Sequence, residues 1–205
     1  MADTKISALT AVTTPASTDE LAVNQSGTSK KMTLLQSNQF NENIMLLDTA
    51  YTLTSTTTAQ KLFNGSTNGA LTLATGWYLL DAVIGITGMS ATSGNGQFQI
   101  LGGGTATLGG VLYHSVGVDG ASGTAATQTG SWSVASNSAA SISTAGTGTS
   151  LLMNIRGAFE VTATGTIIPS IALVTAAAGS VVVGSYFRCK WIGASNSNVV
   201  IGSWS

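Results

Sequence analysis

Side chains that could do chemistry are few in this chain of 205 residues, and they lie far apart along it. His114 is the only histidine and Cys189 the only cysteine. His114 could act as a general base toward a serine, or it could be a strand histidine whose ring is satisfied by a neighbour or by solvent. A single cysteine excludes an intrachain disulfide and a cysteine-based zinc site, so we expect Cys189 to pack as a small apolar side chain.

Cleavage of a glycosidic bond would need a pair of carboxylates, and the longer part of the chain has few of them. Asp119 stands before Gly120, a pair typical of turns, and Glu160 is expected near a turn. Asp81 lies in a strongly apolar segment, where it should form hydrogen bonds or an ion pair. We expect no catalytic residues, no metal site and no cofactor, and glycan hydrolysis stays as an alternative hypothesis.

The composition excludes several classes of protein. Charged residues make 7% of the chain and hydrophobic residues 43%. Scarce Lys, Glu and Arg argue against a helical bundle, while abundant Thr, Val and Ile favour strands. Seven basic residues and a net charge of -1 provide no phosphate-binding stripe, so nucleic acid is not an expected partner. So little charge leaves strand edges poorly protected, which predicts an obligate assembly.

The N-terminus lacks the basic and apolar regions of a secretory signal, and no apolar run approaches the length of a membrane helix. We therefore expect no membrane partner and assembly in a cytoplasm.

The distribution of charge divides the chain into an arm, residues 1–48, and a body, residues 49–205. Eight of the 15 charged residues lie in the arm, whereas Asp119 is the only charged residue between positions 82 and 155.

A small hairpin is predicted within the arm, because residues 20–25 and 30–34 alternate weakly on either side of a turn at 26–29. Residues 34–43 could follow as a short helix. A two-stranded hairpin alone is marginal in water, so the arm should become ordered against a partner.

The body is predicted to be strands throughout. Residues 76–86 contain Gly, β-branched and aromatic residues, which favours a strand buried on both faces. Residues 186–191 alternate most clearly, with Phe187, Cys189 and Trp191 facing the core. Eight to ten short strands, separated by Gly, Ser and Asn turns, predict an all-β sandwich or jelly roll.

The four tryptophans allow two interpretations. Trp77 and Trp191 fall in apolar strands and are expected in the core or at a subunit interface. Trp132 and Trp204 are flanked by serines and could stack on sugars.

The arm contains the motifs KISAL (5–9), TTPA (13–16), DEL (19–21) and GTSKKMT (27–33). Together they resemble the N-terminal virion-attachment segment of tailed-bacteriophage fibre and capsid-decoration proteins. The resemblance covers about residues 4 to 36. It implies a docking arm, whose contact residues we expect to be Ile6, Leu9, Leu21, Val23, Lys30, Lys31, Met32 and Leu34.

The body contains GWY (76–78), GAFEV (157–161), GTIIP (165–169), GSYF (184–187) and IG (192–193). These motifs resemble the trimeric jelly-roll domains, of the tumour-necrosis-factor and complement-globular type, that occur on phage head fibres and cement proteins. The resemblance implies a homotrimer and no catalytic residues. Residues expected in the trimer interface or core are Trp77, Tyr78, Leu80, Ile84, Phe159, Phe187 and Trp191.

The resemblance implies a non-enzymatic virion protein that decorates and stabilises the capsid, docking as a homotrimer on the major capsid protein through its arm. The alternative is a receptor-binding head or tail fibre whose loops contact a glycan on the host surface.

Overall fold

The computed structural model describes residues 19–33, 42–54, 57–64, 69–90, 96–119, 127–134, 140–141, 149–173, 175 and 179–195. Every regular element in these ranges is a β-strand, so the all-β prediction is confirmed. The chain divides into two units, Met1–Asn41 and Glu42–Ser205. None of the described residues belongs to a helix long and apolar enough to cross a membrane.

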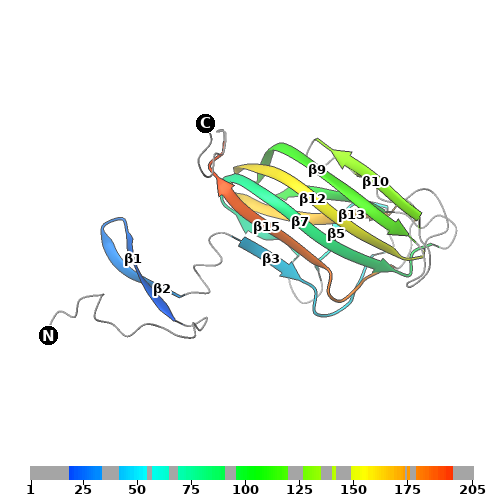
Figure 1. Ribbon diagram of the computed structural model, residues 1–205, viewed down its shortest axis with the longest axis horizontal. Coiled ribbons are helices and arrows are strands. Elements are labelled where there is room, and N and C mark those ends of the chain that lie inside the picture. The colour runs from blue at the N-terminus through cyan, green and yellow to red at the C-terminus, as the bar shows by residue number, and fades with distance from the viewer. Residues whose placement is uncertain are drawn as a thin grey trace. The chain divides into compact units, whose positions relative to one another are not determined.

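The first unit contains the predicted hairpin, made of β1 (Glu20–Gln25) and β2 (Thr28–Thr33) (Figure 1). The two turn residues, Ser26 and Gly27, have φ angles of 54° and 80°. Positive φ at both central positions is the mark of a type I′ turn, whose twist matches that of the flanking strands. Gly27 adopts this conformation without a steric penalty, which explains why the chain reverses here.

The second unit begins with β3 (Glu42–Leu46), which pairs antiparallel with β15 (Tyr186–Gly193) near the end of the chain. The division between the units therefore falls earlier than the predicted boundary at residue 48. The end of the predicted helix at 34–43 also lies in β3, and its other residues lie outside the described ranges up to position 41.

The larger sheet of the second unit has eight antiparallel strands. Besides β3 and β15 it contains β4 (Tyr51–Thr52), β7 (Gly76–Thr87), β9 (Thr107–Asp119), β10 (Thr127–Ser133), β12 (Leu151–Ala163) and β14 (Ser180–Val181). The strand order runs β10-β9-β12-β7, and the far side of β7 pairs with both β15 and β14. Strand β7 is thus the centre of the sheet.

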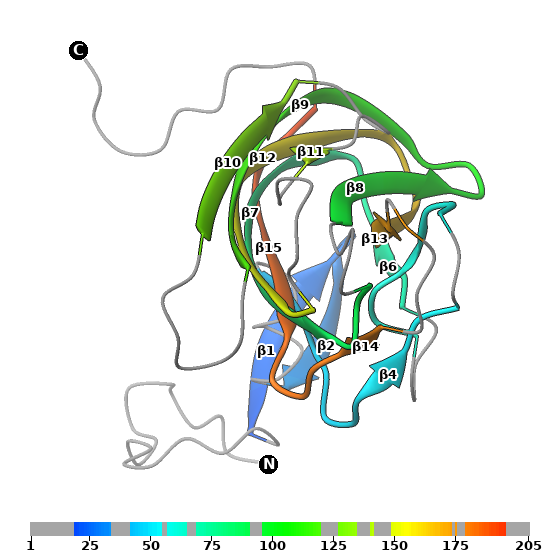
Figure 2. The same ribbon diagram turned by 90° about the vertical axis from the view of Figure 1, so that its right-hand side faces the viewer.

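The smaller sheet has five strands and covers the concave side of the larger one (Figure 2). It contains β5 (Gln60–Lys61), β6 (Leu71–Leu73), β8 (Gly96–Gly103), β11 (Ala140–Ser141) and β13 (Gly165–Leu173). The order is β11-β8-β13-β5, with β6 also paired to β13. The chain steps from the larger sheet to the smaller one between β7 and β8, and again between β12 and β13.

The core lies between the two sheets and is rich in aromatic residues. The rings of Tyr78 and Phe159 stack with centroids 5.4 Å apart, and Phe98 meets Tyr113 edge-on at 5.5 Å. The Tyr113 hydroxyl donates a hydrogen bond to the Phe98 carbonyl across the sheets. Five of the residues predicted for the core or trimer interface are at most 4% exposed, and so belong to the core of the single chain: Tyr78, Leu80, Ile84, Phe159 and Phe187.

The prediction that residues 76–86 are buried on both faces is wrong for the single chain, and Trp191 is less buried than predicted. Strand β7 buries only alternate residues, and Leu79 on its other side is 50% exposed. Trp191 has the predicted core-side register, opposite Tyr78 and with its indole over Gly76, but it lies at the end of the sheet and is 38% exposed. Trp77 is half-buried on the outer side of β7, with its ring against Gly110.

Candidate functional site

The larger sheet turns one side toward the core and the other, which we call the outer face, away from it. The pairing registers place one outward residue from each of six strands in a row across this face. In the order β3, β15, β7, β12, β9 and β10, the row is Ile44, Arg188, Asp81, Arg156, His114 and Trp132. The alternation of the strands thus gathers residues that are far apart in sequence.

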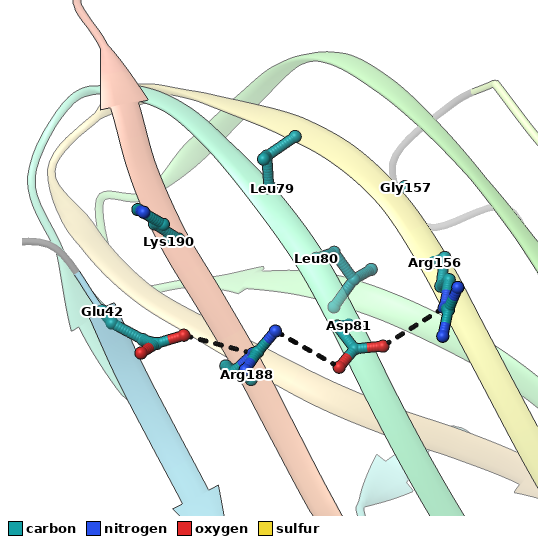
Figure 3. A pocket seen from close by; sticks show the side chains of 8 residues that line it. All are labelled: Glu42, Leu79, Leu80, Asp81, Arg156, Gly157, Arg188 and Lys190. Carbon is teal, nitrogen blue, oxygen red and sulfur yellow. Dashed lines mark ion pairs between the residues drawn. The ribbon is translucent and has the colours of Figure 1, made fainter.

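Asp81 is the centre of a chain of ion pairs on this face (Figure 3). Its carboxylate lies 3.5 Å from Arg156 Nε and 3.7 Å from Arg188 Nη2, and Arg188 Nε lies 3.1 Å from Glu42 Oε1. The Tyr186 hydroxyl donates a hydrogen bond of 3.1 Å to Asp81 Oδ2. Burial and then this carboxylate raise the pKa of Tyr186. The prediction that Asp81, a charged residue in an apolar strand, forms hydrogen bonds or ion pairs is confirmed.

Charge is concentrated on the outer face although the second unit has little of it. From residue 42 onward the sequence has nine Asp, Glu, Lys and Arg residues. Five of them line one shallow hollow: Glu42, Asp81, Arg156, Arg188 and Lys190. The side chains of Arg156 and Arg188 are 67% and 47% exposed, so each pair contributes at most about 1 kcal/mol to folding. Stability alone does not account for this cluster.

Large apolar side chains surround the charged cluster and are open to solvent. Leu79, Leu112 and Leu152 are each at least half exposed, and Val116 is 38% exposed. The edge strands add Ile44, Leu46 and Trp132, each more than half exposed. Scattered exposed apolar residues are normal, but a contiguous group on one sheet face marks an interaction surface.

The structure separates the residues considered for catalysis. His114 is exposed on the outer face, whereas Ser115, its neighbour in β9, is fully buried on the core side, so the two cannot form a catalytic pair. Asp81 and Glu160 lie on adjacent strands but four residues apart in register, which is about 13 Å. That separation exceeds the range of glycosidase acid pairs, which is about 5 to 9.5 Å.

Glu160 was predicted to lie near a turn. It lies within β12 instead, and it is 7% exposed. Its carboxylate accepts hydrogen bonds from the Ser195 hydroxyl and from the Gly110 backbone amide. These contacts give Glu160 a structural role, tying β12 to β9 and to the segment after β15.

Cys189 is fully buried on the core side of β15, as predicted. Burial raises the pKa of its thiol to about 12, so it carries no thiolate at neutral pH. Among the residues that the structure describes, no three His, Cys, Asp or Glu side chains are grouped as metal ligands would be.

The hairpin has two unlike faces. Its register pairs Leu21 with Met32 and Val23 with Lys30, so these four residues share one face, which we call the docking face. Lys31 projects from the opposite side, where its ammonium contacts Glu20 at 2.6 Å, and hydrogen bonding to Glu20 raises the pKa of Lys31.

Leu21 is 41% exposed on the docking face. The other predicted arm contacts, Ile6, Leu9 and Leu34, lie outside the described residues.

Sequence patterns did not identify the Asp81 cluster. Alternation predicted correctly that Arg188 and Lys190 point away from Phe187 and Cys189. It could not predict that β15, β7 and β12 are neighbours, because that requires the strand order. The available signal was the rarity of charge itself, since mid-strand charges in such a chain are exceptional.

No protein-family model matches the sequence, and no curated protein matches it either. Functional inference for this chain therefore depends on the geometry of the hairpin and of the outer face.

Proposed function

We propose that the chain is a non-enzymatic structural protein of a tailed-phage particle, which decorates the capsid as a homotrimer. The observation that carries this proposal is the outer face, where exposed leucines and valines surround a charged cluster of mixed sign. A face of this kind suits self-association, because apolar contact provides affinity while ion pairs of both signs fix the orientation of the copies. The steps of the chain between the two sheets support a jelly roll.

The hairpin unit supports the docking part of the proposal. It forms a compact unit of its own, and its docking face offers Leu21, Val23 and Met32 together with Lys30. Such a small apolar surface binds weakly by itself. Three arms on one trimer raise the effective concentration of each arm at the particle surface, so three weak contacts together keep the trimer bound. The phage setting itself rests on the resemblance of the arm motifs.

Deletion of residues 1–36 tests this division of labour. The truncated chain should remain a soluble trimer by light scattering and should no longer co-sediment with capsids that lack the protein. Full-length protein added to the same capsids is the control. Decoration by the truncated chain would refute the docking role, and a monomeric full-length protein would refute the homotrimer.

Receptor binding is the second candidate, and the exposure of Trp132 favours it. An indole that is 68% exposed can stack on a sugar ring. Glycan binding that is lost in Trp132→Ala, with the oligomeric state unchanged, would support this candidate over decoration.

A further inference from the structure

Trp132 is the most exposed of the large apolar side chains described, and it stands on an edge strand. It belongs to β10, opposite His114 of β9, and is 68% exposed. Strand β10 contains no charged residue. Tryptophan is enriched among the residues that provide most of the binding energy of interfaces, where it fills a pocket on the partner.

The outer face also has a receptor for such an anchor. The hollow above β7, β12 and β15 has Leu79 and Gly157 among its apolar lining, and Arg156, Arg188 and Lys190 are its cationic lining residues (Figure 3). Its two carboxylates, Glu42 and Asp81, pair with the arginines and hold them in place beside the hollow, so the lining keeps one cation in excess. Guanidinium groups attract the electron-rich face of an indole, and tryptophan is the best aromatic partner for a cation. The uncharged β10 brings no like charge toward these cations.

Trp132 cannot fill the hollow of its own chain. Strand β10 lies three positions from β7 in the sheet, a distance of about 14 Å. The Trp132 side chain and the hollow both open outward from the same face, so the indole does not turn toward the hollow. Trp132 can reach such a hollow only on another copy of the chain.

We propose that Trp132 of one copy inserts into the hollow of a second copy, between Leu79 and the guanidinium groups of Arg156 and Arg188. This inference rests on the proposed homo-oligomer and assigns its contact. Each copy gives one anchor and supplies one hollow, so the contact joins two different patches. A contact between two different patches can be exchanged across a twofold axis or repeated around a ring, and it closes into a ring of three when successive copies are related by a threefold rotation.

The experiment measures the dissociation constant of the full-length oligomer by analytical ultracentrifugation. Trp132→Ala should raise it at least tenfold, and Arg156→Ala should raise it by a smaller factor. The double variant should lose less than the product of the two factors, because both changes remove one contact. Val183→Ala is the matched control, since Val183 is 53% exposed in the turn between β14 and β15.

The outcomes separate the two levels of the proposal. If the wild-type chain is an oligomer and Trp132→Ala changes its dissociation constant no more than Val183→Ala does, the anchor is wrong while the oligomer stands. Strictly multiplicative effects of Trp132→Ala and Arg156→Ala would also overturn the contact. A monomeric wild-type chain refutes the oligomer itself. Loss of glycan binding alone would make Trp132 a sugar platform and overturn the proposal.

Discussion

Adjacent lysines on the hairpin should have opposite importance for docking. Lys30 shares the docking face with Leu21, Val23 and Met32, whereas Lys31 is paired with Glu20 on the other side. A basic residue beside apolar contacts fits an acidic site on the capsid. Lys30→Glu should therefore weaken capsid binding, and Lys31→Glu should not.

The magnitude follows from the number of arms. A rim charge pair contributes up to about 1 kcal/mol, which corresponds to a factor of about 5 in affinity for each arm. Three arms that bind together multiply this factor, so Lys30→Glu should lower the avidity of the trimer by about 100-fold. The loss should shrink at high salt, because exposed charges are screened.

Two matched variants isolate the effect of position. Lys31→Glu changes the net charge by the same amount as Lys30→Glu, and Glu20→Lys with Lys31→Glu restores the ion pair in reversed order. Binding of each trimer to undecorated capsids is measured by co-sedimentation over a concentration series. Equal losses for Lys30→Glu and for the charge-swapped variant would refute the assignment of the docking face.

Two further predictions concern the sandwich. Gly157→Ala should lower the free energy of unfolding by about 2 kcal/mol or more, because its Cβ would overlap the Leu112 carbonyl oxygen and lie 2.5 Å from Tyr113 Cα. Gly130→Ala, whose nearest atom is 3.9 Å away, is the control, and equal melting temperatures for the two would contradict this reasoning. Burial raises the pKa of the Cys189 thiol to about 12 in the folded state. In the unfolded state the thiol loses its proton above about pH 9, so the folded state binds one proton more between these two values. Stability should therefore fall between about pH 9 and 12, and Cys189→Val should flatten that fall in alkaline denaturation curves, whereas an unchanged slope would contradict the burial effect.

Sequence patterns predict the sandwich well where only one side of a strand is buried. Phe187 and Cys189 alternate with Arg188 and Lys190, and this pattern gave the correct burial for each of them. Prediction failed where local geometry or strand order decides. Trp191 keeps the core-side register that alternation predicts, but it lies at the end of the sheet and is 38% exposed, which alternation does not indicate.

The outer face itself was beyond prediction, because its parts come from distant strands. Asp81, Arg156 and Arg188 meet only through the order β12-β7-β15. The hairpin, in contrast, was predictable, since both strands and the turn are local.

Strand β3 adds exposed apolar side chains at the edge of the outer face. The chain is apolar from Ile44 to Leu47, so both sides of this segment carry apolar side chains. Met45 and Leu47 pack on the core side, whereas Ile44 and Leu46 point outward and are 57% and 63% exposed. A slip of one residue would expose Met45 and Leu47 in place of Ile44 and Leu46. The observed register leaves Ile44 and Leu46 facing solvent in the single chain, at the edge of the same face that carries Leu79 and the Asp81 cluster. A partner that covers the outer face would remove these exposed side chains from water, which is the role that we propose for the other copies of the chain.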